Sequence, residues 1–454
     1  MKHIKLFSLL LIFSFGIPAS YAEELPPLPP GPLKLTSTTP EMYDPQFWIN
    51  RIQNAEAPII SSKNREAFNR YIEDLIPEQK NLYAMSATER GSLIQDELKK
   101  VFRALRARRL FYSDNSDVQK SFFDEKILPV LDVDDIPSTI RLKWGVAVRS
   151  TSVRALPTAV KTLEKPNDIE FDQFQFSLIK LWTPVAIIHT SSDRKWYFVQ
   201  APYTRGWVKS SDVAVMPSRE EMKKFAAPSR FLVVTGESAP IYGNLALTQV
   251  QQKASMGTVL PFAHETDAAY SIWIPKNTEN GVSFHKAYVS KKSDLSIGYK
   301  TYSQANMIRQ AFKLLASRYG WGGAYNGRDC SGFTHDVFLS LGIQMPRNSQ
   351  DQAFVGTKLG FFKPFNHVDD KIATLYDARP GITLLAMKQH MMLYIGEVNE
   401  KFYVIHSTWA ERISHDSDLK NRINQVVVSD LSLNGNSYLG SLFDRIISMN
   451  EVAS

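Results

Sequence analysis

Only one of the 454 residues is a cysteine, Cys330. A disulfide, a thiolate zinc site and an iron–sulfur cluster each need at least two sulfurs from the chain, so all three are excluded. The folded parts must therefore be stabilised by apolar cores. Hydrophobic residues make up 44% of the chain, near the globular norm, which excludes a disordered or collagen-like chain. The length predicts two to four domains.

The first 22 residues have the pattern of an export signal. Lys2 and Lys5 precede the apolar run 6–15, and Ser20 and Ala22 supply small residues for a cleavage site. The apolar run has about ten residues, whereas a helix that crosses a bilayer needs roughly 20, so cleavage is favoured over a membrane anchor. We expect a mature protein without a transmembrane anchor, in the periplasm or, as the alternative, outside the cell.

The net charge of +7 is small for this length and is compatible with an ordinary solvated surface. The densest basic cluster is Arg103, Arg106, Arg108 and Arg109. Such a cluster is more often the polar face of a helix than a nucleic-acid site, and export argues further against nucleic acid. We expect no nucleic-acid partner.

Residues 23–134 divide into two segments that differ in composition and in hydrophobic pattern. Residues 23–40 are rich in proline, which predicts an extended leader that serves as a spacer. Residues 41–134 show helical signals, which predict an α-helical N-terminal module. Ser86 to Glu89 resemble a capping box, and the apolar residues between Leu93 and Leu105 follow helical spacing.

Two further segments, residues 135–216 and 229–297, contain short strand-like runs between polar turns. The runs are Val185–Ile188, Trp196–Val199, Gly206–Val208, Phe231–Val234, Ile272–Ile274 and Ala287–Ser290. The two segments have similar length and texture without a repeat of fixed period. They predict two small all-β barrels.

The texture changes again from residue 303. A helix is predicted over 303–315, and a second helix begins at Cys330 and stops before Pro346. Free N–H groups and the helix dipole at a helix start stabilise a thiolate, so we expect a lowered pKa for Cys330 and a nucleophilic role. The alternative is a buried structural thiol.

A cysteine nucleophile also needs a base. His390 opens the apolar run 390–396, and His406 lies in the run 402–407, so the two runs are predicted to form a hairpin. With a loop of five or three residues His390 faces His406 directly, on one side of the sheet. A loop of two or four residues places the two histidines on opposite sides. We predict an odd loop, with His390 as base and His406 as the residue that orients it.

Three other histidines compete for these roles. His335 lies within the predicted Cys330 helix and is expected to point elsewhere. His367 and His415 lie in polar, loop-like sequence. No predicted strand pairing places any of the three near the thiol.

At these residues the sequence resembles the NlpC family of papain-like cell-wall cysteine peptidases, over residues 303–454. The matching segments are Tyr319–Gly323, Asp329–Phe333, Leu341–Ile343, Met345–Gln350, Pro380–Gly381, His390–Gly396 and Val404–Ser407. The segments 135–216 and 229–297 resemble bacterial SH3-like domains, on shorter motifs. The chain departs from the family at Ile382, where an aspartate is common.

The resemblance implies a multidomain fold: a helical N-terminal module over 41–134, two SH3-like barrels, and an α+β papain-like peptidase domain over 303–454. It implies that Cys330, His390 and His406 are catalytic and that no metal or cofactor is needed. It also implies that Asp329 and Ser331 help to bind a free substrate amino terminus and that Tyr319 lies near the oxyanion. The implied substrate is the peptidoglycan stem peptide, cut between D-γ-glutamate and the next diamino acid.

Two alternatives remain at this stage. The chain is compatible with a wall-binding scaffold that no longer turns over substrate, and with amide cleavage or acyl transfer on the same fold. The SH3-like domains are expected either to bind wall material or to border the cleft. The sequence does not determine the oligomeric state.

Overall fold

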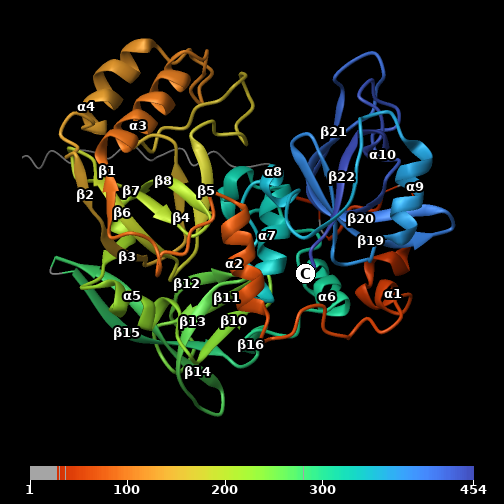
Figure 1. Ribbon diagram of the computed structural model, residues 1–454, viewed down its shortest axis with the longest axis horizontal. Coiled ribbons are helices and arrows are strands. Elements are labelled where there is room, and N and C mark those ends of the chain that lie inside the picture. The colour runs from red at the N-terminus through yellow and green to blue at the C-terminus, as the bar shows by residue number, and fades with distance from the viewer. Residues whose placement is uncertain (1–27, 30, 36, 280, 454) are drawn as a thin grey trace, which may run out of the picture.

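The computed structural model describes residues 28–29, 31–35, 37–279 and 281–453. The predicted export signal and the start of the predicted leader lie outside the described residues. Figure 1 shows two β-rich parts on one side, a third sheet on the other, and helix α7 (Cys330–Ser340) between them. Within the described ranges every helix is too short or too polar to span a bilayer.

The helices before residue 135 do not share one core. They are η1 (Pro40–Tyr43), α1 (Pro45–Ile49), α2 (Arg65–Leu75), α3 (Gly91–Arg106), the π-helical turn η2 (Phe122–Ile127) and α4 (Leu128–Leu131). Phe68 and Ile72 of α2 pack into the core of the C-terminal part, whereas Ile94 and Leu98 of α3 pack into a core formed with the β-rich parts. Helices form where the sequence predicts them, but they are stabilised by two different neighbours and do not build a separate module.

The segment predicted to cap α3 is instead a strand. The strand β1 (Thr88–Arg90) pairs with β2 (Thr139–Arg141), and α3 begins at Gly91 without a side-chain cap. Glu89 pairs with Arg205 at 2.6 Å rather than with the backbone at a helix start. The capping-box prediction is wrong because a sheet partner distant in sequence satisfies these backbone groups. The helical spacing itself is confirmed, since α3 buries Leu98, Phe102 and Leu105.

The two β-rich parts, β-module 1 (residues 135–216) and β-module 2 (residues 229–297), contain all six predicted strand runs. The strands of β-module 1 after β2 are β3 (Lys143–Ala147), β4 (Thr151–Arg154), β5 (Gln175–Ile179), β6 (Pro184–Thr190), β7 (Trp196–Ala201), β8 (Thr204–Lys209) and β9 (Val213–Val215). Those of β-module 2 are β10 (Phe231–Val234), β11 (Ser238–Tyr242), β12 (Val250–Ser255), β13 (Val259–Glu265), β14 (Ala269–Thr278), β15 (Gly281–Ser290) and β16 (Leu295–Ile297).

The two modules have the same topology. The sheet order is β5-β4-β8-β7-β6-β3-β9 in β-module 1 and β12-β11-β15-β14-β13-β10-β16 in β-module 2. Numbered within each module, both read third, second, sixth, fifth, fourth, first, seventh. Helix α5 (Arg219–Ala226) joins them, and its Phe225 stacks on Trp182 of one module and Phe284 of the other. The modules therefore share one fold and one continuous apolar contact.

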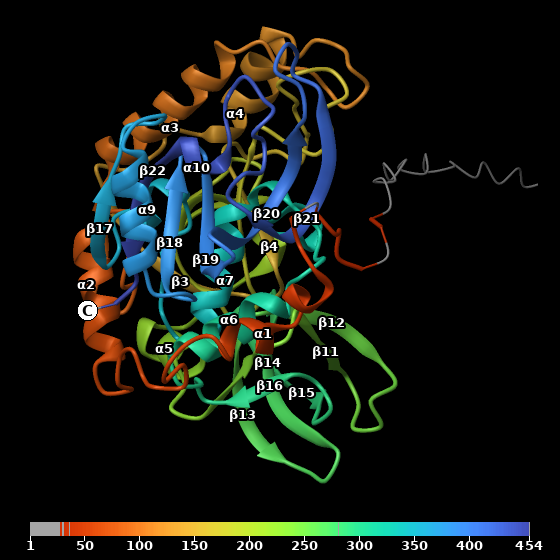
Figure 2. The ribbon, with the colours of Figure 1, turned by 90° about the vertical axis from the view of Figure 1, so that its right-hand side faces the viewer.

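The C-terminal part is a six-stranded sheet between two helical layers. Its helices are α6 (Gln304–Phe312), the 3-10 segment η4 (Trp321–Asn326), α7, α8 (Ser349–Gln352), α9 (Val368–Asp377) and α10 (Leu442–Arg445). Its strands are β17 (Thr357–Phe361), β18 (Thr383–Met387), β19 (His390–Val398), β20 (Lys401–Arg412), β21 (Lys420–Asp430) and β22 (Ile446–Glu451). The sheet order is β17-β22-β18-β19-β20-β21, and β18 to β21 lie near the viewer in Figure 2.

Both faces of this sheet are buried. Leu384 and Leu393 pack with α6 and α7, while the neighbouring residues Leu385 and Met392 face the opposite way and pack with Leu375 of α9. Alternation along a strand sends successive side chains to opposite faces, so each strand supplies both cores. The sheet is thereby a rigid support for side chains that project toward α7.

The described end of the leader contacts this C-terminal part. The backbone N–H of Leu33 donates to Gln425 Oε1 at 3.1 Å, and the hydroxyl of Tyr403 donates to the carbonyl of Ser37 at 2.8 Å. This stretch of the leader is held against the domain, which differs from a free spacer.

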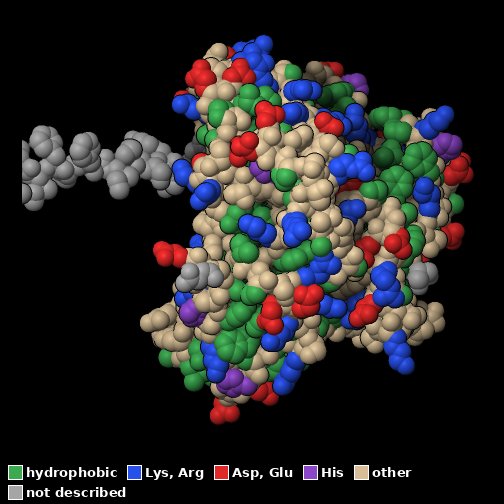
Figure 3. Space-filling view, turned by 60° about the vertical axis from the view of Figure 1, so that its left-hand side comes forward, with side chains coloured by type: hydrophobic (Ala, Val, Ile, Leu, Met, Phe, Trp, Pro, Cys, Tyr) green, Lys and Arg blue, Asp and Glu red, His purple; other side chains and the backbone are tan. Residues whose placement is uncertain are grey.

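Arginines of the basic cluster at residues 103–109 are paired with acids. The ion pairs are Arg106–Asp124, Arg108–Glu164 and Arg109–Asp117. Figure 3 shows basic and acidic side chains interspersed over the face it presents. The geometry fits a solvated surface with compensated charge.

Candidate active site

The thiol of Cys330 lies at the start of α7, as predicted. Asp329 caps the helix, and its Oδ1 accepts the backbone N–H of Gly332 at 2.7 Å. The thiol is 8% exposed, and its Sγ lies 3.9 Å from the carbonyl oxygen of Gln389. The N–H of Met391 also points at the sulfur. These contacts place the thiol against the backbone on both sides of His390.

The two predicted histidines meet, but through a different register. The hairpin loop has two residues, Asn399 and Glu400, both with positive φ, so the predicted odd loop is wrong. A bulge between Tyr394 and Gly396 then shifts the register by one residue. The shift restores the parity that the two-residue loop had removed.

As a result the imidazoles lie on one face, offset diagonally. His390 Nε2 lies 2.7 Å from His406 Nδ1. His406 Nε2 lies 3.1 Å from the hydroxyl oxygen of Ser429 on β21. His406 is fully buried, so its orientation is fixed by these two bonds. Ser429 carries no distinguishing local pattern, and only its strand pairing places it here.

The groups at the site are neutral at rest. Burial, and then the charge of Asp329, raise the pKa of Cys330 to about 12. Burial, and then the nearby Arg445, lower the pKa of His390 to about 4. The pKa of His406 lies well below its usual value for the same reason of burial. The expected lowering of the Cys330 pKa is therefore wrong, because desolvation outweighs the effect of the helix N-terminus.

The three predicted substrate-binding residues surround the thiol. Arg347 Nη1 and Nη2 donate to the two carboxylate oxygens of Asp329 at 3.0 and 2.6 Å. The N–H of Gly322 also donates to Asp329, at 2.9 Å. Arg347 Nη1 donates to Ser331 Oγ at 3.1 Å. Burial, with Asp329 and Cys330 nearby, raises the pKa of Tyr319 well above its usual value, so its hydroxyl stays protonated.

Arg347 is, like Ser429, a residue at this site to which the sequence assigned no role. It lies in the matching segment after Pro346, and its Nε donates to Ser177 Oγ of β-module 1 at 3.1 Å. One guanidinium therefore joins Asp329, Ser331 and a separate part of the chain. Its planar fork suits this task better than a lysine would.

The competing histidines lie elsewhere. His335 is buried within α7, where its Nδ1 lies 3.1 Å from Asp336. His367 pairs with Asp370 on the surface, and His415 is an exposed residue beside Asp416.

A family model covers this constellation. The NlpC/P60 family model matches residues 316–431, which include Cys330, His390 and His406. Residues 316–431 therefore form an NlpC/P60 domain. A model for an SH3 domain of the SH3b1 type matches residues 161–209, so β-module 1 contains an SH3 domain.

Relatives of known name or structure support this assignment. The chain is 29% identical over 188 residues to a gamma-D-glutamyl-L-lysine dipeptidyl-peptidase of Bacillus cereus. The match covers 40% of this chain and 51% of the relative, so it spans about half the length of that curated protein.

Two solved structures share the fold. An NlpC/P60 endopeptidase from Photobacterium damselae subsp. piscicida has a TM-score of 0.71 at 19% identity, covering 94% of this chain and 98% of that one. An NlpC/P60 family protein from Bacillus cereus has a TM-score of 0.51 at 17% identity, covering 68% of this chain and 100% of that one.

The SH3 domain reaches the NlpC/P60 domain through a buried carboxylate. Glu170 is 5% exposed and accepts from Trp409 Nε1 at 2.6 Å and from Asn424 Nδ2 at 2.8 Å. Arg422 pairs with the same carboxylate. The adjacent Phe171 has its ring 6.0 Å from that of Tyr319. The SH3 domain therefore forms a wall next to the NlpC/P60 site.

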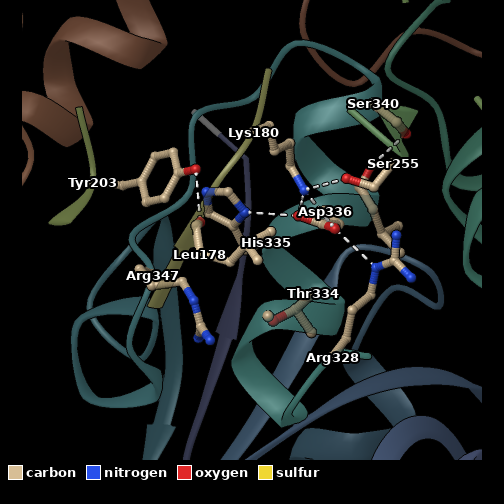
Figure 4. Close-up of polar contacts among 12 residues, drawn as sticks. Leu178, Lys180, Tyr203, Ser255, Arg328, Thr334, His335, Asp336, Ser340 and Arg347 are labelled. Atoms are coloured by element: carbon tan, nitrogen blue, oxygen red, sulfur yellow. Dashed lines mark hydrogen bonds and ion pairs between the residues drawn. The ribbon is translucent and has the colours of Figure 1, made fainter. Parts of the chain in front are cut away.

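A second polar junction lies behind helix α7 (Figure 4). Lys180 of β-module 1 donates to Asp336 of α7 at 2.8 Å and to Ser255 of β-module 2 at 3.2 Å. Arg328 Nε donates to Asp336 at 2.8 Å, and the ring of Tyr203 lies 4.6 Å from that of His335. Both β-modules and the NlpC/P60 domain therefore meet at α7.

Proposed function

We propose that the protein is a cysteine peptidase that hydrolyses peptidoglycan stem peptides. The observation that carries the proposal is the pair His390–His406, bonded at 2.7 Å, together with the lone thiol at a helix start, which contacts the backbone of the residues on both sides of His390. A nucleophile, a base and a group that orients the base form the minimal set for acyl-transfer chemistry through a covalent intermediate.

The hydrogen-bond pattern assigns each nitrogen a task. His390 Nε2 is engaged with His406, so Nδ1 is the nitrogen left to accept the thiol proton. For Nδ1 to accept, Nε2 must carry hydrogen and donate to His406 Nδ1. His406 then carries its own hydrogen on Nε2 and donates to Ser429 Oγ. This chain of donors holds the His390 ring in one tautomer.

The reaction then proceeds in two halves. As Cys330 Sγ attacks the carbonyl carbon, its proton passes to His390 and then to the leaving amine, which leaves a thioester. Water, deprotonated by His390, attacks the thioester and releases the acid and the thiol. Backbone N–H groups at the first turn of α7 are placed to stabilise the oxyanion in both halves.

The resting pKa values make proton transfer depend on substrate. Because the pKa of Cys330 is raised and that of His390 is lowered, the ion pair of thiolate and imidazolium is disfavoured in the free site. The proton is therefore transferred as the carbon–sulfur bond forms, when negative charge moves from sulfur to the oxyanion.

We infer that the cleaved bond joins D-γ-glutamate to the following diamino acid. The name of the Bacillus cereus relative and the resemblance of residues 319–333 to that group of enzymes support this choice. In the free site Asp329 already accepts from Arg347, Gly322 and Gly332. Binding of a substrate ammonium at Asp329 therefore requires it to share these oxygens.

We further infer that β-module 2 is a second SH3-like domain. Its strand order repeats that of β-module 1, and its length is similar. Both modules would then serve as walls and supports for the NlpC/P60 domain.

The decisive experiment is mass spectrometry of products from defined tri-, tetra- and pentapeptide stems, with and without a disaccharide. Wild type should release fragments ending in D-glutamate, and Cys330→Ala should release none. His415→Ala, a change at an exposed histidine away from the site, should behave as wild type.

Identical products from wild type and Cys330→Ala would leave the scaffold hypothesis standing. Cleavage at another amide, or transfer to an added amine in place of water, would favour the amidase or acyltransferase alternative.

A further inference from the structure

A cavity lies where the N-terminal helical region, the two β-modules and the NlpC/P60 domain meet. Its volume is about 520 Å³, and it is lined by α2, by the segment after α2, by both β-modules and by the second half of α7. Small-molecule sites typically span roughly 300–1,000 Å³ and are frequent at domain junctions. The α7 residues in its wall are His335 and Leu339. A rise of 1.5 Å per residue puts Leu339 about 13 Å along the helix from Cys330.

Polar groups in this wall lack partners within the described residues. Thr258 is 2% exposed, and its hydroxyl makes no hydrogen bond. The Nε of Arg65 is also buried without a partner. Tyr83 and Tyr299 also line the cavity, and Tyr299 is near enough to raise the pKa of Tyr83. Buried polar groups are normally paired, so these donors and acceptors indicate a polar ligand.

The charge of the wall is balanced. Arg65 and Lys80 are matched by Glu66 and Glu73, and the third cation of the wall, Lys180, is paired with Asp336 behind it. Burial raises the pKa of Tyr299 to about 12, so its hydroxyl remains neutral. The wall therefore offers no net charge with which to attract an anion or a cation, and a neutral ligand suits it best.

Aromatic rings supply the apolar part of the wall. Tyr203 and Trp182 come from β-module 1 and Phe231 from β-module 2. Tyr299 lies edge-on to Phe231, with ring centroids 5.0 Å apart, and the guanidinium of Arg65 lies 5.2 Å from the Tyr299 ring. Rings combined with hydroxyls suit a ligand that has C–H faces and hydroxyl edges.

We propose that this junction cavity binds a neutral saccharide as a non-catalytic site. A sugar ring presents C–H groups to aromatic rings and several hydroxyls to the unpartnered groups of Thr258 and Arg65 and to the hydroxyls of Tyr83 and Tyr299. The further step, that this sugar is part of the cell-wall glycan, rests on the proposed function. The binding of a saccharide does not depend on it. Because four parts of the chain line the cavity, a bound sugar also stabilises their arrangement.

The test is calorimetric titration of the full-length protein with N,N′-diacetylchitobiose, a neutral disaccharide without a peptide bond to a stem. Wild type should bind it and show a higher melting temperature in its presence. Tyr83→Phe and Tyr299→Phe remove only a hydroxyl and should each weaken binding about fivefold. Tyr112→Phe, outside the cavity wall, should bind as wild type.

Three results would overturn the proposal. They are no binding to wild type, equal binding by the double variant Tyr83→Phe/Tyr299→Phe, and displacement of the disaccharide from the cavity by a free stem tripeptide. The last result would identify a peptide site instead. Binding by Cys330→Ala at wild-type affinity keeps this test separate from the peptidase proposal, since a failure of cleavage leaves the titration unchanged.

Discussion

The two β-modules have the same strand order but attach to the NlpC/P60 domain in different ways. β-module 1 contributes two buried charged side chains, Glu170 and Lys180, which are 5% and 6% exposed. β-module 2 contributes a backbone carbonyl at Glu237, bonded to Arg328 at 3.3 Å, and the half-exposed carboxylate of Asp294, paired with Lys313 at 2.7 Å.

The difference shows that one strand order is compatible with a rigid attachment through buried charges and with a looser attachment through half-exposed groups. A buried charge is costly unless its partner is held in place, so each buried pair fixes the position of β-module 1 closely. A half-exposed pair is screened by water and tolerates small displacements. The module with buried charges is the one whose Phe171 and Ser177 reach the surroundings of Cys330.

The largest effect is expected from Lys180→Met. Removal of this ammonium leaves Arg328 as the remaining cation beside the buried carboxylate of Asp336. Breaking a buried ion pair lowers the free energy of unfolding by about 3 kcal/mol. Urea denaturation with an unchanged slope measures the loss. A cost under about 1 kcal/mol would show that Arg328 alone satisfies Asp336 and that β-module 1 is not fixed by this pair.

Glu170→Gln should act mainly on substrate binding. The change keeps the shape but removes the charge that holds Arg422, so the SH3 wall beside Tyr319 loses its fixed position. We expect KM for a stem tetrapeptide to rise about tenfold while kcat changes little. Steady-state kinetics separates the two parameters, and a fall in kcat alone would assign Glu170 a different role.

Acid should loosen the junction behind α7. Burial lowers the pKa of His335, with Lys180 and Arg347 adding to the effect and Asp336 opposing it. The unfolded chain therefore binds more protons than the folded one below the ordinary histidine pKa of about 6.5, and stability falls as the pH drops through that value. Melting temperatures from pH 7.5 to 5 measure this slope, and His335→Gln should reduce it, while His390 and His406, whose pKa values burial also lowers, maintain the remainder. A slope unchanged in this variant would place the acid-sensitive group elsewhere.

The smallest effect is expected in β-module 2. Lys313→Met removes the partner of Asp294, whose side chain is 45% exposed, and should cost less than about 1 kcal/mol with KM unchanged. The same urea and kinetic measurements apply. A cost comparable to that of Lys180→Met would remove the distinction between the two modules.

The hairpin illustrates how far the sequence predicts the site. The apolar runs identify both strands and both histidines. They do not predict the two-residue loop or the bulge between Tyr394 and Gly396. The loop and the bulge each shift the register by one residue, and the two shifts cancel. A bulge adds one residue to one strand without altering the pattern of residue types, so it is set by pairing with the neighbouring strand.

The thiol shows a second limit. The start of a helix at Cys330 follows from local signals, including Asp329 as its cap. The direction of the pKa shift does not, because burial by β19 and the carboxylate of Asp329 outweigh the helix terminus. Desolvation depends on every element packed around a group, and most of these lie far away in sequence.

The sequence by itself determined six strand runs in the two modules, the helix that begins at Cys330 and the residue types of the candidate site, because these follow from spacing within one segment. Only the tertiary structure decided which core each N-terminal helix joins, that Arg347 and Glu170 connect the SH3 domain to the NlpC/P60 domain, and that the resting thiol is neutral. Those outcomes depend on contacts between distant segments, where burial and pairing fix the free energy of every charge.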